Sequence, residues 1–165
     1  MAVNIHMKIK CPSLLEGESV VKGHEKEIEC ISYGWSMTQS ATTHAGEGGG
    51  SGKVNVHDLS FVKYVDKSSG GLVKLCCAGT HINEAKLTVR KAADAKNSMP
   101  YVEIVMKNCI VTGVTTGAVG DSDRITETVT LNFAEFEYKY TPQDSKHGAG
   151  ASDPAKWNIA KNCEA

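Results

Sequence analysis

Apolar and polar residues alternate along much of this chain. At the N-terminus every second residue from Val3 to Ile9 is apolar, and the residues between them are polar. A period of two is typical of β-strands with one buried face and one exposed face. The same period returns later in the chain, in residues 26–39, 86–91, 101–116 and 124–141. The pattern therefore predicts a mainly β protein.

Some of these strands are predicted to bend. The apolar residues change face near Asp58, and they change again between Phe133 and Phe136. Such a change indicates a bulge or a corner in the strand. Segment 101–116 keeps its period throughout, and its expected core residues are Val102, Ile104, Met106, Ile110 and Val114. Many strands, several of them bent, are typical of a closed or nearly closed β-barrel.

The strand predicted at residues 26–39 has two unlike faces. From Ile31 onward one face is large and apolar, with Ile31, Tyr33, Trp35 and Met37. The other face is small and polar, with Ser32, Gly34 and Ser36. We expect the apolar face to pack in the core. The small face is either an ordinary solvated surface or a smooth wall that lines a cavity or accepts a partner.

One short helix is predicted after residues Asp66 to Ser69, whose side chains are of the types that cap helix N-termini. Leu72, Leu75 and Cys76 follow at a spacing that puts them on one helical face. Gly79 is suited to end the helix, because glycine adopts the left-handed conformation at little cost.

The long glycine-rich loop between Thr43 and Lys53 does not match a phosphate-binding loop. Glu47 stands where that motif needs glycine, and Val54 follows Lys53 where the motif needs serine or threonine. A strand follows the loop, so no helix N-terminus is available to hold an anion. A loop of this length inside a compact domain is usually functional or disordered.

The composition is that of an ordinary soluble domain, with 41% hydrophobic and 22% charged residues. A formal net charge of −1 gives no electrostatic reason to expect binding to nucleic acid or to an anionic membrane. No leader sequence and no membrane-spanning run is found, so we expect synthesis and folding in the cytoplasm. We predict a single domain over residues 1–165, with an ordered core at about 3–142 and a polar segment 143–165 anchored by Trp157.

Residues that could carry chemistry are scattered along the chain. The histidines and cysteines show neither H-x-x-x-H nor C-x-x-C spacing, so reduced thiols are expected and a metal site is not. Asp121 and Asp123 fall in a predicted turn, where aspartate is common for backbone reasons. No nucleophile motif is present. We therefore expect no catalytic residues, no metal and no cofactor.

Four blocks of sequence resemble the haemolysin-coregulated protein (Hcp) family, the tube proteins of bacterial type VI secretion. The first, at residues 32–40, reads S-Y-G-W-S-M-T-Q-S, and the second, at 46–67, reads G-E-G-G-G-S-G-K-V-N-V-H-D-L-S-F-V-K-Y-V-D-K. The third, at 76–92, reads C-C-A-G-T-H-I-N-E-A-K-L-T-V-R-K-A, and the fourth, at 123–134, reads D-R-I-T-E-T-V-T-L-N-F-A. The similarity runs from Val3 to about Gln143 and on toward Trp157.

The resemblance implies a β-barrel of two antiparallel sheets with one flanking helix and an extended loop. It also implies a structural subunit without enzymatic activity, which assembles into six-membered rings. The rings stack into a tube inside a contractile sheath on a baseplate, carry the VgrG spike at the tip, and are exported without a signal peptide. Small effector proteins ride in the lumen and are protected there.

The same resemblance assigns positions in this sequence to contacts. Ser32, Gly34 and Ser36 match a strand that faces the lumen, and Val119 matches another lumen position. The turn at Ala93 and Asp94 matches an edge where the next ring stacks. The extended loop is expected at contacts between subunits or rings, through Thr43, His44, Gly46, Glu47, Gly48, Gly49, Gly50, Ser51, Gly52 and Lys53.

The chain departs from the family pattern at three of these positions. Glu47 interrupts a run that is often all glycine, Val119 is bulkier than the family's small residue, and Gly34 replaces a serine-like position. Because a lumen wall selects cargo by shape and polarity, the cargo does not follow from the resemblance. The alternative that the residues leave open is a soluble β-barrel module that binds a ligand or a peptide.

Overall fold

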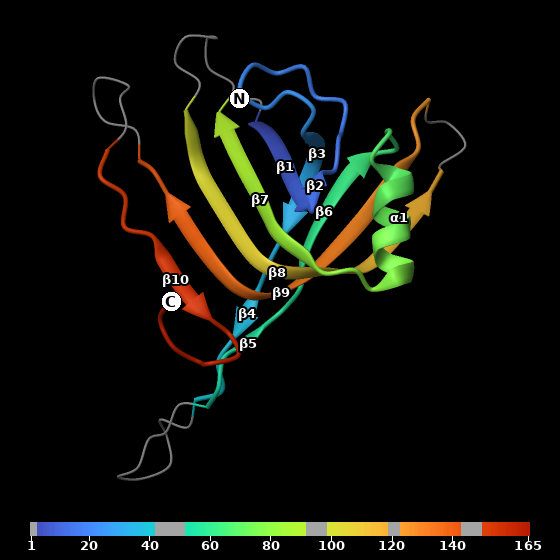
Figure 1. The fold of residues 1–165 in the computed structure, drawn as a ribbon. Coiled ribbons are helices and arrows are strands. Elements are labelled where there is room, and N and C mark those ends of the chain that lie inside the picture. The colour runs from blue at the N-terminus through green and yellow to red at the C-terminus, as the bar shows by residue number, and fades with distance from the viewer. Residues whose placement is uncertain (1–2, 42–51, 92–98, 119–122, 143–149) are drawn as a thin grey trace, which may run out of the picture.

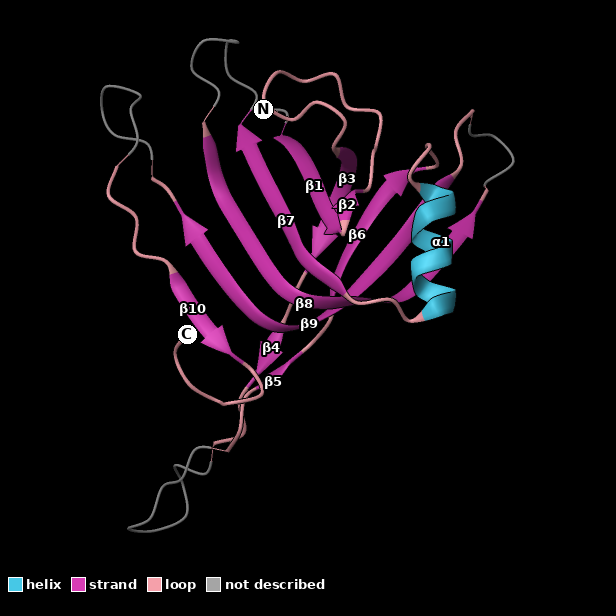
Figure 2. Ribbon diagram, in the orientation of Figure 1, coloured by secondary structure: helices cyan, strands magenta, loops and turns pink. Residues whose placement is uncertain are grey.

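Strands dominate the structure, and one short helix accompanies them within the described residues (Figure 2). The computed structural model describes residues 3–41, 52–91, 99–118, 123–142 and 150–165. The elements are β1 (Val3–Cys11), β2 (Ser13–Leu14), β3 (Ile28–Gly34), β4 (Met37–Thr38), β5 (Asn55–Val56), β6 (Leu59–Tyr64), α1 (Ser69–Ala78), β7 (Ile82–Lys91), β8 (Pro100–Gly117), β9 (Thr126–Tyr140) and β10 (Ala155–Asn158). The mainly β class predicted from the sequence is confirmed.

The larger sheet closes on itself. Its strands pair in the order β9-β6-β3-β1-β7-β8, and β8 pairs back with β9. Strand β10 continues the sheet beyond β9, and β2 pairs with β1. Strands β4 and β5 form a separate two-stranded sheet, which leaves one end of the barrel as a hairpin (Figure 1). The predicted β-barrel is therefore confirmed, with one continuous sheet around the barrel and a small second sheet in the hairpin.

The core lies inside the barrel, where apolar side chains from facing strands meet. Met7 and Ile9 of β1, Ile28 of β3 and Phe61 of β6 are fully buried there. Strands β7, β8 and β9 add further fully buried residues, which are Ile82, Ala85, Leu87, Ile104, Met106, Cys109, Val129 and Leu131. Burial of this much apolar surface supplies most of the stability of the fold.

A corner in the two longest strands explains both a correct and an incorrect prediction. The buried pairs Met106–Phe136 and Cys109–Phe133 are each aligned across β8 and β9, with Asn108 (φ 51°) between them in β8. The change of face predicted between Phe133 and Phe136 is therefore confirmed. In β8 the same corner was not predicted, and the expected core position of Ile110 is wrong. Cys109 and Val111 are buried in its place, whereas Ile110 is only half-buried.

Residues 26–39 do not form the single strand that the alternation predicts. Strand β3 ends at Gly34, and Met37 begins β4 in the hairpin. The pairing of β3 with β6 also shifts between Cys30 and Ser32, which leaves Ile31 as the extra residue of a bulge. Ile31 and Met37 are each 45% exposed, so their predicted core positions are wrong. Tyr33 and Trp35 do pack against the core, as expected.

The predicted helix is confirmed as α1, and its ends are well defined. Leu72 is fully buried, and α1 packs against β8. Gly79 caps the C-terminus in the left-handed conformation, with φ 59°. At the N-terminus the capping differs from the prediction, because the Ser68 side chain makes no hydrogen bond to the helix backbone. The Ser68 backbone N–H and hydroxyl both donate to the Asp66 carboxylate, at 2.8 and 2.5 Å.

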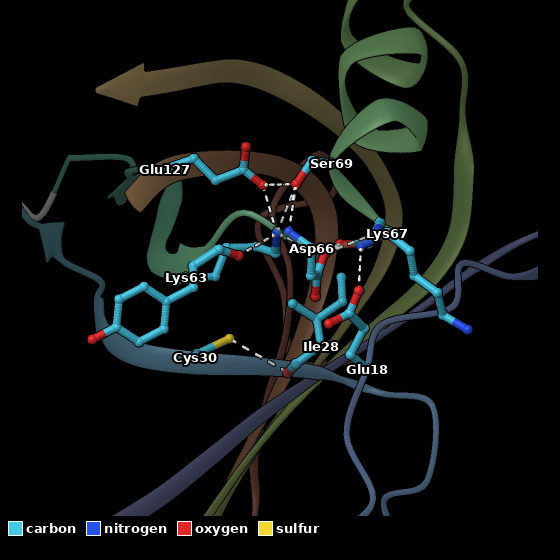
Figure 3. A network of polar contacts seen from close by, with 10 residues as sticks. Glu18, Ile28, Cys30, Lys63, Asp66, Lys67, Ser69 and Glu127 are labelled. Atoms are coloured by element: carbon cyan, nitrogen blue, oxygen red, sulfur yellow. Dashed lines mark hydrogen bonds and ion pairs between the residues drawn. The ribbon is translucent and has the colours of Figure 1, made fainter. Parts of the chain in front are cut away.

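A buried ion network ties this helix end to the barrel (Figure 3). The Lys63 ammonium is fully buried and lies 2.5 Å from the Glu127 carboxylate and 2.8 Å from that of Asp66. It also donates to the Tyr64 carbonyl at 2.8 Å, and the Ser69 hydroxyl donates to Glu127 at 2.6 Å. The network therefore joins β6, β9 and the first turn of α1.

Candidate assembly surfaces

A small, polar surface covers the outside of four neighbouring strands. Registers across β3, β6, β9 and β8 align Gly34 with Ser60, Ser60 with Thr130, and Thr130 with Gly113. A second row aligns Ser32, Val62, Thr128 and Thr115 in the same way. These positions alternate with core residues such as Phe61 and Val129, so their side chains point away from the core. We call these two rows the small-residue face.

Close packing at two glycines keeps this face level. The Ser60 hydroxyl donates to the Gly34 carbonyl at 3.2 Å, and a Cβ at Gly34 would lie 3.3 Å from that hydroxyl. A Cβ at Gly113 would lie 2.8 Å from the Thr130 hydroxyl. A larger residue at Gly113 therefore has to displace Thr130, whereas a side chain at Gly34 has room to project outward.

The edge of the small-residue face toward the hairpin carries one oriented carboxylate. Asp58 accepts a hydrogen bond from the Thr112 hydroxyl at 2.5 Å and another from the Asn132 amide at 2.8 Å. The Thr130 hydroxyl lies 2.9 Å from that of Thr112 and donates to it, because the single Thr112 proton is used for Asp58. These bonds join β8, β9 and the β5–β6 connection, where the change of face near Asp58 was predicted.

The structure separates the predicted lumen residues into two places. Ser32 and Gly34 lie side by side on the small-residue face and are exposed. Ser36 is exposed too, but it lies between β3 and β4, where its carbonyl accepts from the His57 backbone N–H at 3.0 Å. It belongs to the base of the hairpin. Val119 lies outside the described residues.

Of the predicted contact loop, the structure describes Gly52 and Lys53, the last two residues. The Gly52 backbone N–H donates to the Ser40 carbonyl at 2.8 Å, and the Gln39 amide donates to the Gly52 carbonyl at 2.7 Å. These bonds hold the two arms of the hairpin together at this level. The other predicted contact residues lie outside the described part, namely Thr43, His44, Gly46, Glu47, Gly48, Gly49, Gly50, Ser51, Ala93 and Asp94.

An apolar groove between the hairpin and strands β9 and β10 was not predicted from the sequence. It has a volume of about 770 Å³, and its lining includes Trp35, Met37, Val54, Val56, Phe136, Tyr138 and Trp157. The Trp35 ring meets Phe136 edge to face, at 4.8 Å between centroids. The indole N–H of Trp157 is buried and has no hydrogen-bond acceptor among the described residues. Met37, which was expected in the core, is exposed and lines this groove.

Another part of the outer surface, on β7, β8 and β9, is charged. Lys86 of β7 and Lys139 of β9 flank Glu103 of β8, at 2.5 and 3.5 Å. Burial raises the pKa of the Glu103 carboxyl, but the two lysines outweigh burial and hold that pKa below its ordinary value. Further pairs join Lys10 to Glu84 and Lys156 to Glu137. The barrel thus has a neutral face and a charged face.

The described part of the chain has neither a metal-binding cluster nor a membrane-spanning helix. No group of three or more histidine, cysteine, aspartate or glutamate side chains is arranged to hold a metal ion among these residues. No helix among them is long and apolar enough to cross a membrane. The cysteines described are free thiols, and burial raises the pKa of Cys109 to about 12.

Comparisons with known proteins agree with one another. A family model described as "Type VI secretion system effector, Hcp" matches residues 6–140. The protein named hcp1 from Pseudomonas aeruginosa is 46% identical over 167 residues, which cover 100% of both chains. The crystal structure of Hcp1 from Salmonella typhimurium has a TM-score of 0.82 at 34% identity, with 100% of both chains covered. A structure described as a type six secretion system protein has a TM-score of 0.89 at 26% identity, and the match covers 99% of this chain and 100% of that one.

The likeness extends over both sequence and fold. The family model spans the closed barrel from β1 into β9, and the two structures cover the rest of the chain as well. The small-residue face, the hairpin and α1 all lie inside the matched region. The chain therefore belongs to the Hcp family of type VI secretion tube and effector proteins.

Proposed function

We propose that this protein is a structural subunit of the type VI tube, which assembles into six-membered rings that stack. In this proposal it has no enzymatic activity, and its working surfaces lie between copies of the chain and around the lumen. It is made in the cytoplasm and exported by the apparatus as part of the tube. The VgrG spike, the contractile sheath, the baseplate and small effector proteins in the lumen are its other partners.

The apolar groove is the observation that carries the self-assembly part of the proposal. Trp35, Met37 and Val56 leave apolar surface accessible to solvent, and the groove runs along β10, which pairs only with β9 among the described strands. An open strand edge beside an apolar groove is usually covered by a partner. The unpaired indole N–H of Trp157 is a donor that a carbonyl of a neighbouring copy could satisfy.

Ring closure needs two different and complementary patches on each subunit. The protruding hairpin and the groove at its base provide one patch. We propose that the loop from Thr43 to Lys53 is a contact arm that meets a neighbouring copy. The turn at Ala93 and Asp94 is proposed to meet the next ring.

The small-residue face supports the lumen part of the proposal. Its two rows hold serine, threonine, glycine and valine, without a charged side chain among these eight positions. A neutral, level wall lets a cargo protein slide in and stay by many weak contacts. We propose that Ser32, Gly34 and Ser36 face the lumen, with Val119, and that the charged outer face points away from it.

A charge placed in the groove tests the assembly surface. Val56→Asp puts a carboxylate into the groove, where association would bury it without a partner, so we expect loss of the ring. Val73→Asp is the matched control, because Val73 is 46% exposed on α1 and does not line this groove. Sedimentation at micromolar concentrations should show a hexamer for the wild type and the control, and a monomer for Val56→Asp.

Two results would contradict this proposal in different ways. If the wild type sediments as a monomer at every concentration tested, the ring is wrong and the alternative of a soluble binding module is favoured. If Val56→Asp remains hexameric, the ring stands but the groove is not its interface. Thermal unfolding of each variant checks that the barrel itself is intact.

A further inference from the structure

Two histidines stack where the loop 15–27 crosses the outside of the barrel. The His6 and His24 rings lie 4.5 Å apart between centroids and are nearly parallel, at 12°. His6 belongs to β1, and His24 belongs to the loop between β2 and β3. His6 is only 2% exposed, and its ring Nδ1 has no hydrogen-bond partner in the part of the chain that the structure describes. Burial disfavours a charge on the His6 ring, so the closed stack favours the neutral form of that imidazole.

Charged groups surround this pair unevenly. On the loop, His24 Nδ1 lies 2.6 Å from the Glu27 carboxylate, and Lys8 of β1 lies 3.6 Å from the same carboxylate. Glu29 of β3 favours a proton on His6, whereas Arg90 of β7 opposes it. Glu27 also favours a proton on His6, but its carboxylate is already engaged by His24 and by Lys8.

The stack is one of several attachments of this loop to the barrel, among them the Leu15 backbone N–H to the Ile9 carbonyl at 2.9 Å and the Lys67 backbone N–H to the Glu18 carboxylate at 3.1 Å. Within the loop, Gly17 bonds to Lys26 at 2.7 Å and Ser19 bonds to Glu27 at 3.1 Å, so the loop has its own internal pairing. Outside it, the described contacts include the Arg90 guanidinium to the Lys22 carbonyl at 3.5 Å and Lys67 to Glu16 at 2.9 Å. Lys26 also has a left-handed backbone, with φ 63°, which is strained for a residue with a side chain. Loss of the stack thus loosens the part of the loop around His24, while the contacts of Leu15, Glu16 and Glu18 remain.

We propose that His6 and His24 form a pH-sensitive latch, which holds the His24 part of the loop 15–27 against the barrel at neutral pH and releases it when the buried His6 ring takes up a proton. The open loop exposes His6 to water, so the proton is bound more easily there than in the closed state. Because type VI secretion takes the protein out of the buffered cytoplasm, the latch would respond to an acidic surrounding after export.

The direction of the pH effect follows from linkage. Burial, and then the charge of His24, lower the pKa of His6 below its ordinary value of 6.5. The closed state therefore binds fewer protons than the open state, and it loses stability as the pH falls below about 6.5. The opening constant should rise about tenfold for each unit by which the His6 pKa lies lower in the closed state.

Hydrogen exchange of the full chain, read by mass spectrometry, tests the latch. Peptides that cover residues 15–27 should exchange faster at about pH 5 than at about pH 7.5, after correction for the intrinsic rate, while β7 and β8 stay protected. His6→Phe keeps a ring in the stack but cannot take a proton, so the acid response should disappear. His24→Phe keeps a ring over His6 but removes the charge of His24, which lowers the His6 pKa, so the response should shrink. His81→Gln removes an exposed histidine outside the pair and should respond like the wild type.

Several results would overturn the latch. One is a corrected exchange rate in the loop that does not change between the two pH values. Another is a rise in exchange at the lower pH that the whole barrel shares. A third is a full acid response in His6→Phe. If His6→Phe does not fold, exchange of the histidine ring Cε1–H in the wild type decides instead. A His6 pKa at or above its ordinary value of 6.5 refutes the proposal, and a lower one together with a fast loop supports it.

Discussion

Lys63 provides a sharp test of what holds α1 on the barrel. Its ammonium is fully buried between the carboxylates of Glu127 and Asp66, whose side chains are 3% and 11% exposed. Lys63→Met keeps the length and volume of the side chain but removes its charge. Two carboxylates then stay in a dry site without the cation that faced them (Figure 3).

The magnitude follows from this burial. Removing one partner of a buried ion pair costs about 3–5 kcal/mol, because the other charge remains without compensation. A small domain has about 5–15 kcal/mol of stability in total, so the loss would be a large part of it. Adding Glu127→Gln to Lys63→Met removes one of the stranded charges, and we expect about 1–3 kcal/mol to be recovered.

Lys67→Met is the matched control for this prediction. Lys67 lies four residues further along, but it is 47% exposed and pairs with Glu16 at the surface. A surface pair of this kind contributes about 0–1 kcal/mol. The two variants therefore remove the same type of charge from the same neighbourhood, in buried and exposed settings.

Urea unfolding followed by tryptophan fluorescence measures the free energies, with all proteins at the same protomer concentration because self-association shifts the midpoint. We expect the midpoint to fall strongly in Lys63→Met and little in Lys67→Met, with unchanged slopes. The reasoning is refuted if Lys63→Met loses less than about 1 kcal/mol, or if Glu127→Gln restores nothing to it.

Three further predictions concern single surfaces. Gly34→Gln projects a long side chain from the small-residue face, where the Ser60 hydroxyl is the described atom near a Cβ at this position. The ring should still form, but less cargo should co-purify with it. Loss of the ring would show instead that this face is an interface. Gly79→Ala should cost about 1 kcal/mol in unfolding experiments because of its left-handed φ of 59°, whereas Gly70→Ala, with open space around it inside α1, should stabilise by about 0.5–1 kcal/mol. Deleting residues 46–51 should weaken hexamer formation in sedimentation more than it lowers the melting temperature, and equal losses would argue against a contact arm.

The sequence predicts this fold well where each strand keeps a simple period. The first strand, the helix with its Gly79 cap, and the change of face between Phe133 and Phe136 all follow from local patterns. The prediction failed at Ile31 and Ile110, because a bulge in β3 and a corner in β8 reverse the faces there. No local sequence pattern in these segments predicts that the buried face changes, since valine and isoleucine occur on both sides of β8.

The sequence likewise indicates one part of the candidate assembly surfaces and misses another. Ser32 and Gly34 were expected on one small face, and their strand neighbours complete it in the structure. The rows extend to Thr130 and Gly113, which only the long-range register brings beside them. The apolar groove was missed because its walls come from three distant parts of the chain. Met37, predicted in the core, is exposed there because the hairpin leaves the barrel before that residue.

The central claim is that this chain builds a ring, and a negative-stain image of the purified wild-type protein tests it most directly. The account predicts six-lobed particles with a central hole, and a native mass six times that of the 17.6 kDa chain. Particles of a single lobe without a hole, at concentrations where the protein is folded, would contradict it.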